Sequence, residues 1–130
     1  QNLLSAMMPF AGFDGTWQSI QRVAAANNMR CLRADNFWEH NAIIQDIVSL
    51  IDRSEIVVCD CSSRNPNVFY EMGIAHSLGK EVILITQNAA DIPFDIAHHR
   101  HIRYLNNGEG LQKLEAELSA RVATLKGRQR

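Results

Sequence analysis

The chain has 130 residues, of which 46% are hydrophobic and 21% charged, values that are ordinary for one globular domain. Its formal net charge of -1 argues against a protein that binds the backbone of a nucleic acid, because such proteins carry a basic excess. No apolar run reaches the length of a membrane span, so we expect neither a membrane nor a nucleic acid as partner.

The cysteines indicate the redox compartment of the protein, and the first residue bears on how the chain begins. Cys31, Cys59 and Cys61 are odd in number, and the last two point to the same face of one predicted strand. We therefore expect reduced core cysteines in a cytoplasmic protein. No internal repeat or linker divides residues 1–130, which we interpret as a single domain. Because residue 1 is glutamine, we expect a processed start or a piece of a longer protein.

Apolar β-prone segments predict five strands, and amphipathic stretches predict helices between them. The expected elements, in chain order, are a strand over Leu3–Met8, a helix capped at Asp14, Gly15 or Thr16 and closed by Asn27-Asn28, a strand over Cys31–Ala34, a helix carrying Ile43 to Ile51, a strand over Ile56–Cys59 that ends at Asp60, a helix from Pro66 to about Leu78, a strand over Val82–Thr86, a strand over Ile102–Leu105, and a last helix with an apolar stripe from Leu111 to Leu125.

Alternation of strands and helices predicts a parallel sheet with helices on both faces. We expect an α/β, flavodoxin/Rossmann-like three-layer sandwich whose five strands follow the order 2-1-3-4-5. In such sheets ligands bind outside the carboxyl ends of the strands, at the switch point between strands 1 and 3. The loops at that point are Pro9–Gly15 and Asp60–Asn67.

The second of these loops leads into a helix with a carboxylate near its start. Asn65 is a favourable N-cap, and Pro66 suits the first helical position. Glu71 then lies between one and two turns inside, where the helix dipole favours an ionised carboxylate. Asn67 and Ala75 are expected on the same face as Glu71. The spacing leaves open whether that face is buried or exposed to solvent.

Carboxylates around one crevice suit the chemistry of glycosidic bonds. Glu71 would be the nucleophile, and Asp46 a proton donor or a group that positions the ligand. Asn65 and Asn67 would bind sugar hydroxyls, and Asp60 would accept from a hydroxyl or hold a neighbouring residue. The alternative for Asp46 and Asp60 is a carboxylate that satisfies backbone N–H groups at a helix end or in a loop.

The loop after the first strand supplies further candidates for substrate binding, namely Pro9, Phe10, Gly12 and Phe13. Phe10, Phe13 and Trp38 could stack on a base, or they could simply pack in the core or a loop.

Other motifs are too weak to predict a cofactor or a metal. Gly12 and Gly15 form only G-x-x-G, which is insufficient for a dinucleotide fingerprint or a P-loop. The run His98-His99-Arg100-His101 lacks a partner cluster, and its spacing matches no known zinc arrangement. We therefore predict no cofactor and no metal.

Three segments together resemble the nucleoside 2-deoxyribosyltransferase-like family, over the range from Leu3 to about Tyr104. These are Met8-Pro9-Phe10, the segment from Asp60 through Asn65-Pro66-Asn67-Val68-Phe69-Tyr70-Glu71-Met72-Gly73-Ile74-Ala75, and Gly79-Lys80. The family includes the 2′-deoxynucleoside 5′-phosphate N-hydrolases and is related in fold to TIR-type NAD-cleaving domains.

The resemblance implies roles for single residues. Glu71 matches the glutamate that forms the covalent deoxyribosyl intermediate, and Asp46 matches the aspartate that assists the leaving base. Two positions depart from the pattern. Asn65 stands where the transferases carry an aspartate and the hydrolases a serine, and Phe10 stands near a tyrosine. The resemblance also implies a homo-oligomer.

Two functions follow as competing hypotheses. The first is an enzyme, either a nucleoside deoxyribosyltransferase or a nucleotide N-glycosidase. It would cleave or transfer the N-glycosidic bond of a nucleoside, a nucleotide or a NAD-like molecule through Glu71. The second is a non-catalytic module that senses a nucleotide within a signalling or defence protein. A flavodoxin-like receiver fits less well, because the acidic pair expected after the first strand is absent, although Asp60 is suitably placed.

Overall fold

The computed structural model describes residues 2–34, 44–96 and 99–128. Within them the elements follow the predicted alternation. They are β1 (Leu3–Met7), α1 (Asp14–Ala26), β2 (Arg30–Arg33), α3 (Ile44–Arg53), β3 (Ile56–Asp60), the short 3-10 helix η1 (Ser62–Arg64), α4 (Pro66–Ser77), β4 (Glu81–Thr86), the 3-10 helices η2 (Ala89–Asp91) and η3 (Phe94–Ile96), β5 (His101–Arg103) and α5 (Gly108–Arg128).

The described strands form one five-stranded parallel sheet in the order β2-β1-β3-β4-β5, which confirms the predicted fold class and strand order. Strands β1, β3 and β4 lie inside the sheet, and every residue of β1 and β3 is buried. Burial on both faces explains why these segments are apolar without alternation in the sequence.

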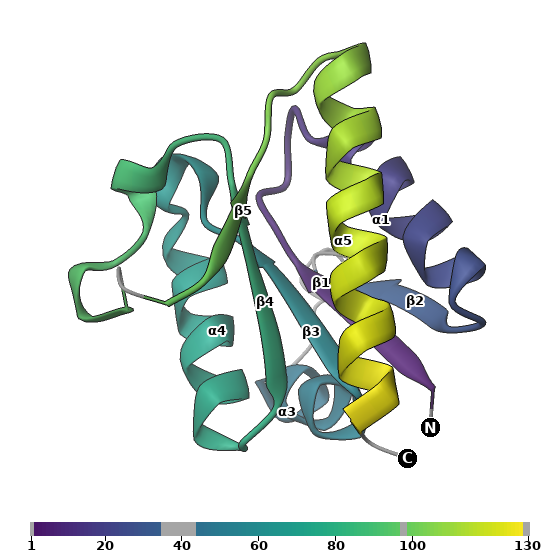
Figure 1. Ribbon diagram of the computed structural model, residues 1–130. Coiled ribbons are helices and arrows are strands. Elements are labelled where there is room, and N and C mark those ends of the chain that lie inside the picture. The colour runs from purple at the N-terminus through teal and green to yellow at the C-terminus, as the bar shows by residue number, and fades with distance from the viewer. Residues whose placement is uncertain (1, 35–43, 97–98, 129–130) are drawn as a thin grey trace.

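Helices cover both faces of the sheet, α1 and α5 on one side and α3 and α4 on the other (Figure 1). Successive strand residues point alternately to the two sides. Ile56 and Val58 therefore belong to the core under α1 and α5, whereas Val57 and Cys59 belong to the core under α3 and α4. This three-layer arrangement places the carboxyl ends of all strands at one edge, where the loops are free to form a site.

Several element bounds differ from the predicted ones by a residue or two, and the starts of two helices add detail that the sequence did not give. Helix α1 begins at Asp14 after Phe13, with no side-chain cap, so none of the predicted caps precedes the helix. Strand β5 ends at Arg103 rather than at Leu105, because Tyr104 is drawn into the polar network described below. Helix α5 begins at Gly108, where the Asn107 side chain accepts the Gly110 N–H at 2.7 Å.

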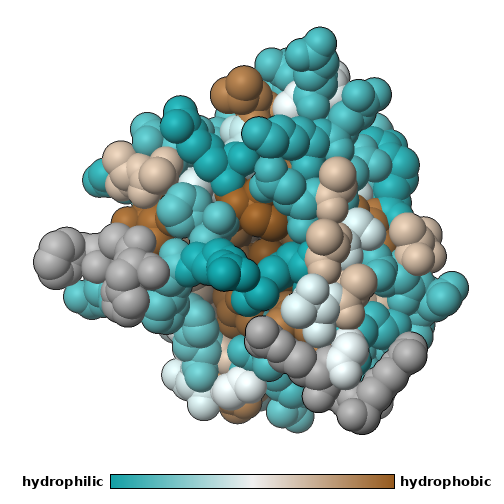
Figure 2. Space-filling model, in the orientation of Figure 1, coloured by the Kyte–Doolittle hydropathy of each residue, from teal (hydrophilic) through white to brown (hydrophobic). Residues whose placement is uncertain are grey.

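The surface in the view of Figure 1 is mostly hydrophilic, and hydrophobic residues show mainly in the middle, between α4 and α5 (Figure 2). The two ends of the described chain meet at the edge opposite the carboxyl ends of the strands, where the Lys126 ammonium donates to the Asn2 side chain at 3.0 Å. Among the described residues, none of the helices combines the length and the apolar character needed to cross a membrane.

Candidate functional site

The register of the sheet brings the ends of its inner strands to one level. Met7 at the end of β1 pairs with Cys59, and Asp60 at the end of β3 pairs with Ile85 in β4. The loops that follow β1, β3 and β4 therefore leave the sheet side by side. Since the strand order reverses between β1 and β3, this edge is the switch point that the sequence predicts.

Asp60 is fully buried at the centre of a polar network. Its Oδ1 accepts the Ser62 N–H at 2.9 Å, and its Oδ2 accepts the Tyr104 hydroxyl at 2.5 Å. The same Tyr104 oxygen receives hydrogen bonds from the Thr16 hydroxyl at 3.2 Å and the Gln87 amide at 3.3 Å. The network thus joins the ends of β3, β4 and β5 to the first turn of α1.

Burial has the largest influence on the pKa values of Asp60 and Tyr104 in this network. It raises the pKa of Asp60 above its ordinary value, although the hydrogen bonds from Ser62 and Tyr104 act in the opposite direction. Burial also raises the pKa of Tyr104, and the nearby charge of Asp60 adds to that effect. Of the two roles foreseen for Asp60, the contacts within the described residues match the second, which is to hold its neighbours in place.

Glu71 is buried, with 2% of its surface exposed, which decides between the two faces that the sequence left open. It lies on the buried side of α4, which carries Val68, Glu71, Met72 and Ala75. The charge of Glu71 also contributes, after burial and Cys61, to the raised pKa of the Cys59 thiol, so its carboxylate lies near the end of β3. Asn67 lies one turn before Glu71 on the same helix, as the spacing predicts, but it is exposed at the start of α4.

Asp60 and Glu71 lie on opposite sides of the sheet. Asp60 contacts Tyr104 from the side of α1 and α5, whereas Glu71 lies near Cys59 on the side of α3 and α4. Adjacent strand residues point to opposite faces, so Cys59 and Asp60 mark this division. The structure therefore places the two carboxylates in different halves of the core.

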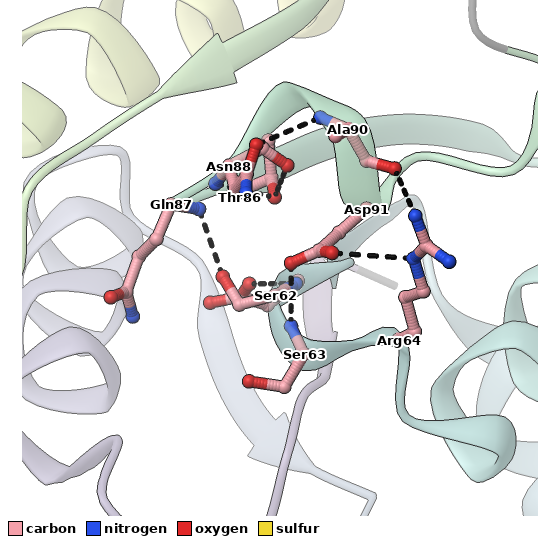
Figure 3. Close-up of polar contacts among 9 residues, drawn as sticks. Ser62, Ser63, Arg64, Thr86, Gln87, Asn88, Ala90 and Asp91 are labelled. Atoms are coloured by element: carbon pink, nitrogen blue, oxygen red, sulfur yellow. Dashed lines mark hydrogen bonds and ion pairs between the residues drawn. The ribbon is translucent and has the colours of Figure 1, made fainter.

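The loop between β3 and α4 holds the start of the helix in place. Asn65 caps α4 as predicted, since its Oδ1 accepts the N–H groups of Asn67 at 2.9 Å and Val68 at 3.3 Å. Upstream in the loop, the Ser62 hydroxyl accepts the backbone N–H of Gln87 at 2.9 Å (Figure 3). The loops after β3 and β4 are thus tied to each other.

The four candidates for substrate binding in the loop after β1 differ in how far they are exposed to solvent. Phe10 is 55% exposed, and Gly12 is exposed with a φ of 84°, which favours glycine. Pro9 is buried, and Phe13 is buried within the core under α1 and α5, so the packing interpretation fits Phe13 better than base stacking. The Arg33 guanidinium donates to the carbonyl oxygens of Pro9 at 2.7 Å and Phe10 at 3.1 Å.

The remaining candidate residues are not tied to the polar network around Asp60 by the contacts described above. Asp46 is exposed in the first turn of α3, a helix that packs against α4. Trp38 and His98 lie outside the described residues. Among the described residues, no group of histidine, cysteine and carboxylate side chains is arranged to hold a metal ion.

Sequence analysis missed Thr16, Arg33, Gln87 and Tyr104 as members of the site. Tyr104 follows Asp60 by 44 residues and Thr16 by 88, so no local spacing could connect them. The only available signal was position, because Gln87 directly follows a predicted strand and Tyr104 lies near the end of another.

Comparison with solved structures found a protein of the same fold. It is BcmB, a CMP N-glycosidase from Clostridium botulinum, with a TM-score of 0.57 and 16% sequence identity over 86% of this chain and 98% of that chain. No protein-family model matches the chain. No curated protein matches it either. At this identity the likeness establishes a shared fold over most of both chains.

Proposed function

We propose that this protein cleaves the N-glycosidic bond of a nucleotide or a related nucleoside, with Glu71 as the nucleophile. The observation that carries the proposal is the burial of Glu71 in the second turn of α4, beside the end of β3. An ionised carboxylate is costly to bury unless its surroundings support it, and a position near a helix N-terminus does so. The fold shared with a CMP N-glycosidase supports the choice of a nucleotide as substrate.

The chemistry is a double displacement. The Glu71 carboxylate attacks the anomeric carbon, and the base leaves with the electrons of the C–N bond and takes up a proton. Water then attacks the glycosyl ester and releases the sugar with the carboxylate restored. Asp46 is our candidate for the proton donor, because α3 packs against α4. In a transferase a second base would replace water.

The substrate would lie between the loops that follow β1 and β3. Phe10 is exposed there and can stack on a base, and Gly12 leaves room for a close approach. Asn65 and Asn67 remain our candidates for the sugar hydroxyls. We further propose that the chain is a member of the nucleoside 2-deoxyribosyltransferase-like family, that it acts in the cytoplasm without a cofactor, and that it forms a homo-oligomer.

One observation favours a second candidate, a module that senses a nucleotide without turnover. The Asn65 side-chain oxygen already accepts two backbone N–H groups as the helix cap. Only its amide nitrogen is left for a sugar, whereas the related transferases have a carboxylate at this position. Loss of a sugar contact that strengthens only in the transition state would slow the reaction more than it weakens binding.

The two functions are separated by chromatography of a panel of deoxynucleosides, ribonucleosides, their 5′-monophosphates and NAD. Each compound is incubated with wild-type protein and with Glu71→Ala. Free base or nicotinamide released by wild type alone would establish the enzyme and name its substrate class. If no compound is cleaved but one raises the melting temperature, the protein is a sensor and the enzymatic proposal is wrong.

A further inference from the structure

The loop before α4 contains two neighbouring residues in a backbone conformation that side chains disfavour. Ser63 has a φ of 65° and a ψ of 10°, and Arg64 has a φ of 53°. Residues with a Cβ adopt this left-handed region at a free-energy cost, so it persists only where surrounding contacts enforce it. These two strained residues directly precede Asn65, the N-cap of α4.

Asp91, from the connection between β4 and β5, supplies contacts that enforce this conformation (Figure 3). Its Oδ2 accepts the Ser63 N–H at 2.9 Å, and its Oδ1 lies 3.3 Å from the Arg64 Nε. The Arg64 guanidinium also donates to the Ala90 carbonyl at 2.9 Å. A carboxylate that receives a backbone N–H and a guanidinium holds both strained residues at once.

The loop therefore depends on a segment that is distant in sequence. The Ser63 and Asp91 partners are 28 residues apart. An exposed ion pair alone would contribute little, since the Arg64 side chain is 65% exposed. The hydrogen bond to the Ser63 backbone is different, because it acts directly on the strained peptide.

We propose that Asp91 is a positioning residue that clamps Ser63 and Arg64 in the left-handed conformation and thereby fixes the start of α4, which carries Glu71. If the clamp opens, the loop relaxes and the first turns of α4 shift. The catalytic part of this inference depends on the function proposed above. A displacement of about 1 Å can slow a reaction on the order of a hundredfold.

The clamp itself is tested by hydrogen exchange of the segment Cys61–Val68, measured by mass spectrometry without any ligand. We expect Asp91→Ala to speed exchange in this segment, because the Ser63 N–H loses its acceptor. Asp95→Ala is the matched control, since Asp95 is an exposed aspartate in the same connection. Unchanged exchange in Asp91→Ala would overturn the clamp, whether or not the protein is an enzyme.

The positioning role is tested by the kinetics of base release. Asp91→Ala should lower kcat at least about tenfold, because a shift of the first turns of α4 displaces the nucleophile Glu71. Adding Ser63→Gly should restore part of the lost kcat, since glycine adopts a positive φ without strain. Ser63→Ala is the control for loss of the hydroxyl and should restore nothing.

These results keep the two proposals apart. A wild-type protein that cleaves nothing would refute the proposed function, while hydrogen exchange would still decide the clamp. Faster exchange in Asp91→Ala together with wild-type kcat would refute positioning. Equal losses of kcat with and without Ser63→Gly would show that Asp91 does not act by holding Ser63 in the left-handed conformation, and would also refute positioning.

Discussion

Single carboxylates in this protein differ because their surroundings differ. Asp60 has no contact with solvent and receives a tyrosine hydroxyl and a backbone N–H, so it organises three strand ends. Glu71 lies on the other side of the sheet, near the Cys59 thiol. The sequence placed both residues at the correct edge, but it could not show which face each one occupies.

The raised pKa of Asp60 predicts a pH effect on stability. Because the folded-state pKa lies above the unfolded value, the folded protein binds more protons between the two values. The contribution of Asp60 is therefore fully present below the unfolded value, near 3.8, and is lost as pH rises through the folded value. Asp60→Asn removes this dependence while keeping an acceptor for the Ser62 N–H.

Urea unfolding of wild type and Asp60→Asn checks this sign. We expect the mutant to gain stability relative to wild type as pH rises from about 4 towards neutrality, in the window set by the raised pKa. A constant difference between wild type and Asp60→Asn across this range would contradict the raised pKa of Asp60.

At the scale of elements, α4 illustrates what a sequence reveals and what it conceals. The pair Asn65-Pro66 predicted the start of α4 correctly, because an N-cap depends only on residues that are neighbours in the sequence. The buried face was not predictable, because apolar residues surround the helix on nearly all sides and leave no clear polar stripe. Only packing against the sheet decides that Glu71 faces inward.

The cap predicts a specific loss of stability. Asn65→Ala should lower the free energy of unfolding by about 1 kcal/mol, because the N–H groups of Asn67 and Val68 lose their acceptor. Asn67→Ala, two residues later and exposed, should have much less effect in the same urea titration. Equal effects of the two substitutions would show that the Asn65 side chain does not act as a cap.

The start of α5 offers a second matched pair. A Cβ at Gly110 would lie 2.1 Å from the Leu105 carbonyl oxygen, whereas one at Gly108 would have nothing within 4 Å. Gly110→Ala should therefore destabilise the protein by roughly 1–3 kcal/mol, the usual range for overpacking. Gly108→Ala should be close to neutral. Melting temperatures compare the two, and a tolerated Gly110→Ala would contradict the close packing of this turn.

At the scale of the whole molecule, the fold was predictable because its signals are local and repeated. Buried strands, short turns and amphipathic helices alternate along the chain, and handedness then leaves few arrangements. The site was only partly predictable, because it gathers Thr16, Ser62, Gln87, Asp91 and Tyr104 from separate elements. Long-range contacts of this kind have no signature in a single sequence.

The central claim is that a buried glutamate on this fold breaks a glycosidic bond, and Glu71→Gln tests it most directly. Glutamine keeps the size of the side chain and removes the nucleophile. Glu109→Gln, at an exposed position in the first turn of α5, makes the same change as a control. The measurement is the rate of base release from nucleoside monophosphates at equal protein concentrations, with melting temperatures confirming that each variant is folded.

We predict release by wild type and Glu109→Gln, and a loss on the order of a thousandfold or more in folded Glu71→Gln, because the covalent route is closed. Base release by Glu71→Gln at the wild-type rate would contradict the assignment of Glu71 as the nucleophile.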